Sequence, residues 1–282
     1  MINILKNSKI CYGPMSKNIV DSLIKFSNNT EIPIILIPSR RQIDWNGGYV
    51  NNWTTECFTN YVKEKSKYII IQRDHGGPGQ GLNDDDGYES LRHDCKYFDA
   101  IHIDPWKKYQ NLAEGIQWTL DMILFCYNLN SNLYFEVGTE EQSGTTNTIE
   151  ELNYDLLAIE TFCNKKNLPL PSFVVVQTGT RVMETRNVGS FDSPLRVFDE
   201  VPAEIQVPKM IEICKKHNIM MKEHNTDYLS DVALSWHPRL GIHAANVAPE
   251  FGVVETKAFL EIMEDNHLNT QAKRFLELAE IW

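Results

Sequence analysis

Residues Tyr68–Pro78 read YIIIQRDHGGP, an apolar β-branched run that ends abruptly in charged and glycine residues. Such a run is typical of a buried strand in a parallel sheet. Similar short runs recur along the chain, and longer helical patterns separate them. The predicted strands are Lys9–Tyr12, Pro33–Ile37, Tyr68–Gln72, Ala100–Ile103, Leu133–Val137, Phe173–Gln177, Ile219–Lys222 and Gly241–Ala245.

A helical pattern follows each of the eight predicted strands. Eight strand–helix repeats predict an α/β protein with a (β/α)8 TIM barrel, and an open doubly wound sheet is the alternative. We expect residues 1–282 to form a single domain that ends in a helix at about residues 270–281. The predicted helices are Asn18–Phe26, Thr55–Lys65, Tyr88–Tyr97, Tyr109–Tyr127, Ile149–Lys165, Ala203–His217, Asp227–Trp236, Glu255–Asp265 and Thr270–Ile281.

The composition excludes several classes of partner. The net charge is −11 and the pI about 5.2, which argues against nucleic acid because phosphate binding needs a basic face. No apolar stretch approaches the length of a membrane span, and the first residues lack the pattern of a signal peptide. The six cysteines form no CxxC pair and are read as reduced thiols. These features predict a cytoplasmic protein without a membrane partner.

In such a barrel, catalytic groups lie at the carboxyl ends of the strands. Polar residues follow nearly every predicted strand, and we expect several of them to bind substrate. The segment 179–193 suits a phosphate through Arg181, although a surface loop is the alternative. A helix cap competes as an interpretation of Asp104 and Asp227. The expected substrate-binding residues are Arg41, Gln42, His102, Gln177, Arg181, Asn225, Asp227 and Asn246.

Three histidines and a carboxylate from separate strands suggest a metal site. His75, His224, His243 and Glu136 are expected to surround one divalent ion at about 2.0–2.2 Å. A single histidine is more often an ordinary core or surface residue, and His243, within a predicted strand, faces either the core or the helices.

Carboxylates near these histidines are expected to move protons. Asp74 stands beside His75, and a carboxylate next to a metal ligand can act as a general acid or base. Glu136 and Asp104 are expected to share this catalytic role.

Six motifs occur along the chain in a single order, and together they resemble the so-called non-catalytic subunit family of class II D-tagatose-bisphosphate aldolase. The resemblance runs from about Lys9 to about Leu260, and the chain lacks the long C-terminal extension of the family. The motifs are Pro38–Tyr49, Asp74–Pro78, Ile101–Asp104, Glu136–Glu140, Val174–Gly179 and Glu223–Tyr228.

The resemblance implies a TIM barrel related to the zinc-dependent class II aldolases and to metal-dependent ketose 4-epimerases. In the zinc enzymes an Asp–His pair after the third strand supplies the acid/base and a zinc ligand, and the last strands supply further histidines. Asp74, His75, His224 and His243 are placed similarly. Zinc is therefore the expected ion, with manganese or another divalent metal as alternatives. His243 and Asn246 stand where the family pattern has apolar and lysine residues.

Three functions remain open from the sequence. The first is a metal-dependent lyase of the aldolase type, in carbohydrate metabolism, that acts on a ketose or ketose phosphate. The second is a metal-dependent ketose 4-epimerase, for which Asp104 and Glu136 would serve the two faces of the sugar. The third is a non-catalytic subunit that stabilises an aldolase. A homo-oligomer or an aldolase partner subunit is expected alongside the small-molecule sugar.

Overall fold

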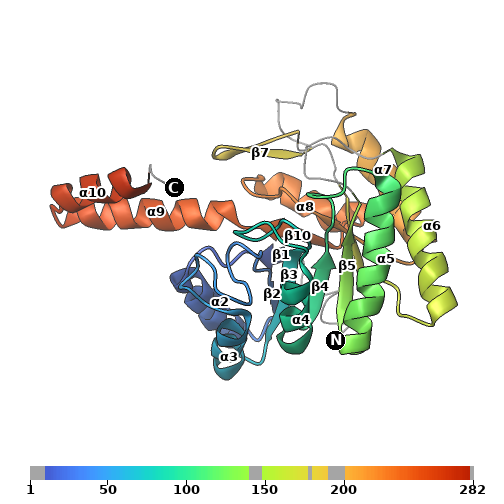
Figure 1. Ribbon diagram of the computed structural model, residues 1–282. Helices are drawn as coiled ribbons and strands as arrows, with labels where there is room; N and C mark the ends of the chain where they lie inside the picture. Colours follow the sequence, from blue (N-terminus) through green and yellow to red (C-terminus); the bar gives the residue numbers. More distant parts are fainter. Residues whose placement is uncertain (1–9, 140–147, 177–179, 190–200, 280–282) are drawn as a thin grey trace.

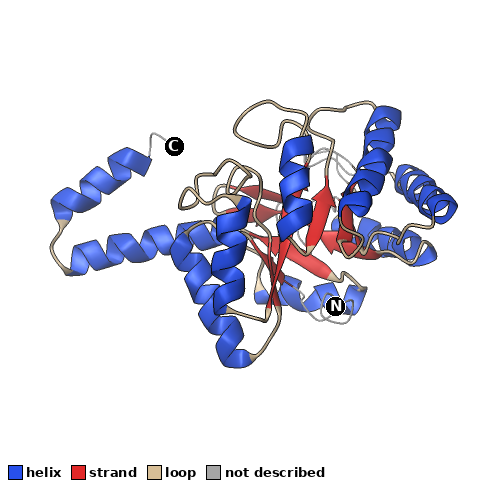
Figure 2. Ribbon diagram, turned by 60° about the horizontal axis from the view of Figure 1, so that its bottom comes forward, coloured by secondary structure: helices blue, strands red, loops and turns tan. Residues whose placement is uncertain are grey.

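In the computed structural model, which describes residues 10–139, 148–176, 180–189 and 201–279, eight parallel strands close into a barrel with helices around it (Figure 1, Figure 2). The strands pair in the order β1-β10-β9-β6-β5-β4-β3-β2. The prediction of a (β/α)8 barrel is confirmed, and the open sheet is excluded. The barrel strands are β1 Ile10–Tyr12, β2 Ile34–Leu36, β3 Ile69–Gly76, β4 Ala100–Ile103, β5 Tyr134–Gly138, β6 Phe173–Val176, β9 Met220–Glu223 and β10 Ala244–Val247.

The helices lie outside the barrel, and polar side chains fix where many of them begin. Thr148 and Glu151 form a reciprocal capping box at the start of α6, and the Ser230 side chain accepts a hydrogen bond from Ala233 N at the start of α8. The helices are α2 Lys17–Thr30, α3 Thr55–Lys65, α4 Tyr88–Tyr97, α5 Leu112–Leu129, α6 Ile149–Lys166, α7 Ala203–Lys216, α8 Asp231–Leu240, α9 Pro249–Asp265 and α10 Asn269–Ala279.

Two predicted helix starts were wrong, and one side chain explains both. Asp227, expected to begin a helix, instead accepts hydrogen bonds from the backbone N–H groups of Ala248 and Glu250, at 2.9 and 2.8 Å. These are unpaired donors of the first turn of α9, which starts at Pro249 rather than at Glu255. Asp227 therefore caps a helix distant in sequence.

A short antiparallel hairpin, β7 Arg181–Met183 and β8 Arg186–Val188, was not predicted. It occupies part of the segment that the sequence suggested as a phosphate loop. Arg181 and Arg186 are both exposed on it.

The barrel interior changes character along its axis. Toward the amino ends of the strands it is apolar, with Cys11, Ile35 and Phe173 among the buried residues of one cluster. Closer to the carboxyl ends, on β3 and β9, come Gln72 and Lys222, which are also fully buried. This polar layer leads to the carboxyl ends, where parallel-barrel chemistry is located.

The chain ends in a projecting pair of helices. α9 extends away from the barrel and α10 folds back along it (Figure 1, Figure 2), with the rings of Phe259 and Phe275 6.3 Å apart. No described residue of α9 or α10 is buried. None of the described helices has the length and apolar composition needed to cross a membrane.

Candidate metal centre

Four side chains from four strands, three of them adjacent in the barrel, meet at its carboxyl end. Asp74 lies on β3, His102 on β4, Glu136 on β5, and His224 directly after β9. Each offers one ligand atom, and these atoms all lie within 4.8 Å of one another. The four side chains are called the carboxylate–histidine cluster below.

The spacing within the cluster suits a bound cation. His102 Nδ1 lies 3.5 Å from Asp74 Oδ1 and 3.6 Å from Glu136 Oε1. His224 Nε2 lies 4.0 and 3.8 Å from the same two oxygens. Ligands around a tetrahedral ion with bonds of about 2.1 Å are about 3.4 Å apart, so small side-chain shifts would close this set on an ion.

One carboxylate is held on one side and left open on the other. Glu136 Oε2 accepts hydrogen bonds from Lys222 Nζ and Gln72 Nε2, both at 2.8 Å. Glu136 Oε1 is buried and has no hydrogen-bond partner among the residues that the structure describes. An unpaired buried carboxylate oxygen is costly, so the residues present fit a cation at this position.

The charges of the cluster also suit a metal. Burial alone would raise the pKa of Glu136, but Lys222 and the histidines hold it well below its usual range. Burial would also raise the pKa of Asp74, but the neighbouring imidazoles outweigh burial and lower it. Burial lowers the pKa of His224, which favours the neutral imidazole that binds metals. The cluster thus offers two negative carboxylates and a neutral nitrogen ligand.

A glycine makes room for His102. A Cβ atom on Gly138 would lie 3.1 Å from His102 Nε2, closer than nearly all real contacts of this kind. The glycine therefore lets the imidazole stand with Nδ1 toward the cluster.

His75 lies beside the cluster rather than within the group of four. Its backbone has a φ of 49°, in the left-handed region, and its ring centroid is 5.2 Å from those of His102 and His224. Its Nδ1 is 2.5 Å from Asp104 Oδ2, which also accepts a hydrogen bond from Gln80 Nε2. Burial lowers the pKa of His75, but Asp74 and Asp104 outweigh burial and raise it to about 9. His75 and Asp104 form an ion pair at the rim.

Asn246 joins the cluster from β10. Its Nδ2 lies 2.9 Å from His224 Nε2 and 3.4 Å from Asp74 Oδ1. Asn225, one residue after His224, has a φ of 59°, and its carbonyl accepts a hydrogen bond from Asn187.

His243 lies apart from the cluster. It precedes β10, and its Nδ1 accepts a hydrogen bond from Met221 N at the amino ends of the strands. It stands three residues before Asn246, which is about 10 Å along a strand.

Four further residues expected to bind substrate also lie elsewhere. Gln42 is buried and accepts a hydrogen bond from Ser39 N, whereas Arg41 is exposed. Asp227 caps α9, as described above. Gln177 lies outside the described residues, and Arg181 is exposed on the hairpin.

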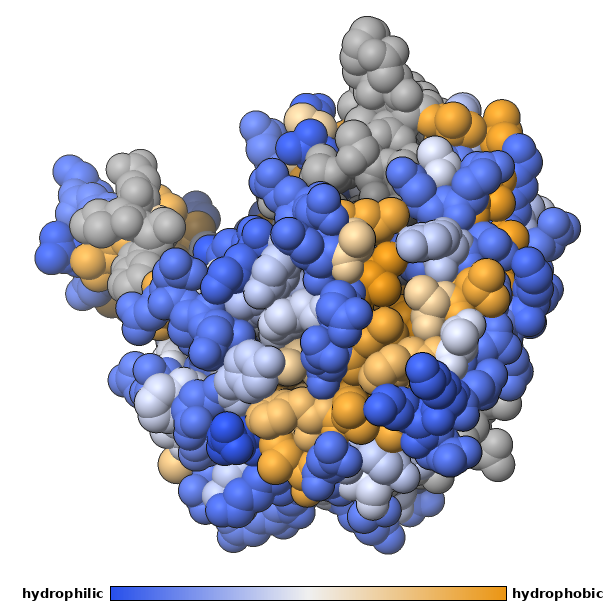
Figure 3. Space-filling view, turned by 45° about the vertical axis from the view of Figure 1, so that its right-hand side comes forward, coloured by the Kyte–Doolittle hydropathy of each residue, from blue (hydrophilic) through white to orange (hydrophobic). Residues whose placement is uncertain are grey.

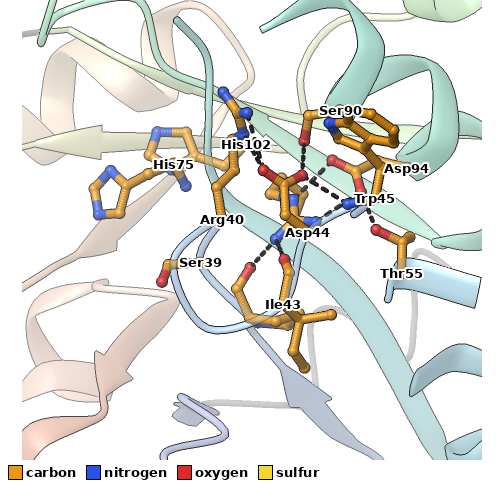
Figure 4. Close-up of polar contacts among 12 residues, drawn as sticks. Ser39, Arg40, Ile43, Asp44, Trp45, Thr55, His75, Ser90, Asp94 and His102 are labelled. Carbon is orange, nitrogen blue, oxygen red and sulfur yellow. Dashed lines mark hydrogen bonds and ion pairs between the residues drawn. The ribbon is translucent and has the colours of Figure 1, made fainter. Parts of the chain in front are cut away.

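A second polar network lies behind β3 and is fully paired (Figure 4). Arg73 forms a double ion pair with Asp94, at 2.7 Å for each bond. Arg40 pairs with Asp44 and Asp85 and donates a hydrogen bond to the carbonyl of Gly77, at 2.7 Å. This arginine–aspartate network fixes the start of the glycine-rich loop that follows His75.

Sequence reasoning missed two groups that support the cluster. Lys222 was read as the end of a strand and Gln72 likewise. The sequence does contain a signal for them, because each is a charged or amide side chain within an otherwise apolar run. Lys222 lies in IMMKEH and Gln72 in IIIQ, and both positions face the barrel interior.

Comparisons with known proteins show which solved structures have a similar fold. No protein-family model matches the chain, and no curated protein matches it in sequence. Solved structures do match, and those described here share its fold at low sequence identity. A "probable tagatose 6 phosphate kinase" from Sinorhizobium meliloti 1021 is 16% identical with a TM-score of 0.70, over 89% of this chain and 67% of the other.

Two aldolase structures are similar in the same way. The YdjI aldolase from Escherichia coli K12 is 15% identical with a TM-score of 0.62, over 99% of this chain and 94% of its own. A fructose-bisphosphate aldolase from Campylobacter jejuni is 12% identical with a TM-score of 0.64, over 96% and 79%. The chain therefore has a barrel of the kind found in aldolase structures, with a cluster at its carboxyl end that can hold a metal.

Proposed function

We propose that this protein is a metal-dependent lyase of the aldolase type that cleaves a ketose or ketose phosphate. The observation that carries the proposal is Glu136 Oε1, a buried oxygen without a hydrogen-bond partner among the described residues, facing two imidazoles. Lys222 and Gln72 occupy its other oxygen, so the carboxylate presents one atom to the site. The aldolase-like fold is consistent with this chemistry.

In this proposal His102, Glu136 and His224 hold the ion, and Asp74 acts on the substrate. Catalytic zinc sites combine three protein ligands with one open position, and a mixed nitrogen and oxygen set suits zinc, with manganese as the alternative. The three ligands are almost fully buried, whereas the side chain of Asp74 is 13% exposed toward the mouth. When bound, the ion would polarise the substrate carbonyl.

The remaining steps fall to side chains of the chain itself. The ionised Asp74 takes the proton of the substrate hydroxyl, the neighbouring carbon–carbon bond breaks to give an aldehyde, and its electron pair moves toward the ketone to give an enolate. The enolate carbon then takes a proton back from Asp74, which restores the carboxylate. His75, held by Asp104, lies 3.6 Å from Asp74 Oδ2 and orients that carboxylate. Asn246 sits beside both Asp74 and His224 and would bind a substrate oxygen.

An epimerase is the second candidate, and the His75–Asp104 pair favours it. This pair would supply a second proton-transfer group at the rim, in addition to Asp74. An epimerase that cleaves and rejoins the same bond needs such groups on two sides of the sugar. All six cysteines are free, so we propose that either enzyme works in a reducing compartment such as the cytoplasm.

The test combines metal content with product analysis. The purified protein, reconstituted with zinc or manganese, should hold about one ion per chain, and a panel of ketoses and ketose phosphates should yield aldehyde fragments. Recovery of a new ketose without fragments would favour the epimerase. A protein that binds no metal after reconstitution would contradict both, and would favour a non-catalytic stabilising subunit.

A further inference from the structure

The glycine-rich loop after β3, residues 77–87, closes on itself beside the carboxylate–histidine cluster. Its two ends meet, because a Cβ atom on Gly87 would lie 2.7 Å from the carbonyl carbon of Gly77. Gly77 also lies against the end of β4, where an added Cβ would overlap the carbonyl oxygen of Asp104. The loop is therefore a compact unit that packs on the residue that holds His75.

Polar contacts, rather than apolar packing, hold this loop in place. The guanidinium of Arg40, which is buried, donates hydrogen bonds at 2.7 Å to the carbonyl of Gly77 and to Asp85 Oδ1, near the two ends of the loop. Gly81 packs on the same guanidinium, since a Cβ atom there would lie 3.0 Å from Nη2. The loop exposes one large apolar side chain, Leu82, whereas apolar side chains form a band on the outer face that Figure 3 shows. The loop is thus folded around Arg40.

One side chain of the loop, Gln80, reaches the rim of the candidate site. Gln80 Nε2 donates a hydrogen bond at 3.0 Å to Asp104 Oδ2, the same oxygen that lies 2.5 Å from His75 Nδ1. The other oxygen of Asp104, Oδ1, accepts a hydrogen bond from the backbone N–H of Trp106 at 3.2 Å. The carboxylate that holds His75 is therefore itself held by two donors, and Gln80 is the one that the loop supplies.

We propose that Gln80, carried by the loop around Arg40, is a positioning residue: it fixes Asp104, and through Asp104 the imidazole of His75. His75 needs this support because its φ of 49° is a conformation that persists only where the surroundings hold it. An amide suits the role, because it donates to Asp104 without adding a charge to the rim. The effect on catalysis rests on the proposed function, in which His75 orients Asp74 from 3.6 Å.

Steady-state kinetics of the metal-reconstituted protein test the effect of Gln80 on the reaction. Gln80→Ala removes the donor to Asp104, and we expect kcat to fall about 10-fold. Gln80→Glu keeps the shape but places a carboxylate against that of Asp104, and kcat should fall about 100-fold. KM and metal content should stay within about twofold, because in this proposal the amide contacts neither the substrate nor the ion. A rise in KM with unchanged kcat would overturn the positioning role.

Asn83→Asp is the matched control. It makes the same change from amide to carboxylate on the same loop, but Asn83 is exposed to solvent, which screens the new charge. Its kcat should stay within about twofold of wild type. Equal losses in Asn83→Asp and Gln80→Glu would mean that charge on the loop, and not the contact with Asp104, lowers the rate, and would overturn the proposal.

A double-mutant cycle tests whether the loop acts through Gln80. Asp85→Asn weakens the hold of Arg40 on the loop, and we expect kcat to fall about threefold to tenfold. In the Gln80→Ala background the same substitution should have little further effect, because the contact that the loop positions is already lost. Additive losses would show that the loop affects the site by another route and would overturn this step of the proposal.

The imidazole signals of His75 in isotope-labelled protein separate this inference from the proposed function. The hydrogen bond to Asp104 should give a downfield Nδ1–H proton signal, assigned by its loss in His75→Asn. Gln80→Glu should shift or broaden this signal, and Asn83→Asp should not. If the wild-type protein lacks lyase activity but the signal responds, the proposed function fails and the role of Gln80 in holding His75 stands. If neither the signal nor kcat responds to Gln80→Glu, the positioning role is overturned.

Discussion

The carboxylate–histidine cluster and the arginine–aspartate network lie on either side of β3, yet they are built in opposite ways. In the network each described charge has a close partner, such as the two 2.7 Å bonds between Arg73 and Asp94. In the cluster the distances between carboxylate oxygens and imidazole nitrogens are 3.5–4.0 Å, and Glu136 Oε1 has no hydrogen-bond partner among the described residues. A set of charges in which every group is paired specifies the structure, whereas a set with an unpaired oxygen can bind a ligand.

Removing one partner of the closed network should give the largest loss of stability. Asp94→Asn leaves the guanidinium of Arg73 buried without its counter-charge, and we expect the free energy of unfolding to fall by about 3–5 kcal/mol. Urea denaturation at neutral pH measures this. The double variant Arg73→Met with Asp94→Leu removes both charges and should be more stable than Asp94→Asn. If Asp94→Asn costs less than 1 kcal/mol, the network is not the structural element that its geometry indicates.

Removing a ligand of the open cluster should change metal binding more than stability. Glu136→Gln keeps the shape of the side chain but loses its charge, and we expect metal affinity to fall about 100-fold. Competition with a chelator measures the affinity. Asp74→Asn is the matched comparison, because its carboxylate acts on substrate in our proposal: activity should be lost while the affinity stays within about tenfold. The opposite pattern would make Asp74 the ligand.

A carboxylate outside both regions makes the stability of the protein depend on pH. Both oxygens of the buried Asp155, on α6, lack hydrogen-bond partners among the described residues, and burial, with Glu151, raises its pKa from 3.8 to about 7. The folded state keeps this proton between about pH 4 and 7 while the unfolded chain has released it, so stability falls as the pH rises through that window. Asp155→Asn should therefore be up to about 4 kcal/mol more stable than wild type at pH 8 and equal to it near pH 4. Urea denaturation at several pH values tests this, and an equal difference at all pH values would contradict it.

The smallest effect is expected at the other end of the barrel. His243→Ala should leave metal affinity within about twofold, because His243 precedes β10 and lies about 10 Å along the strand from Asn246. The same chelator competition applies, with His224→Ala as the control that should lose binding. A large loss in His243→Ala would show that the metal site extends to the amino ends of the strands.

The fold could be predicted from the sequence because its signals are local. Each barrel strand is a short β-branched run, and α3 and α4 have the bounds that the pattern of Thr55–Lys65 and Tyr88–Tyr97 predicted. β3 was predicted to end at Gln72 but continues to Gly76. Arg73 and Asp74 have the polar character of residues that follow a strand, but both lie within β3. Arg73 belongs to the arginine–aspartate network and Asp74 to the carboxylate–histidine cluster.

The site could be predicted only in part because it depends on contacts between strands. The strand predicted at Gly241–Ala245 is β10, Ala244–Val247, in the structure, so His243 lies before the strand and not in the group of four. His102 was expected to bind substrate, and its parity on β4 instead places it in the group of four. The pairing of Glu136 with Lys222 joins positions far apart in sequence, which no local pattern reveals.

Asp227 gives the molecule a further property. It follows His224 by three residues, and its carboxylate holds the first turn of α9, which itself begins three residues after Asn246. The first turn of α9 is thus bonded to the two segments that carry His224 and Asn246. If a shift of this turn moves these segments, the effect is reciprocal by thermodynamic necessity: the factor by which the shift tightens metal binding is the factor by which the metal favours the shift. The position of α9 and the metal supply would then act as two inputs to one equilibrium.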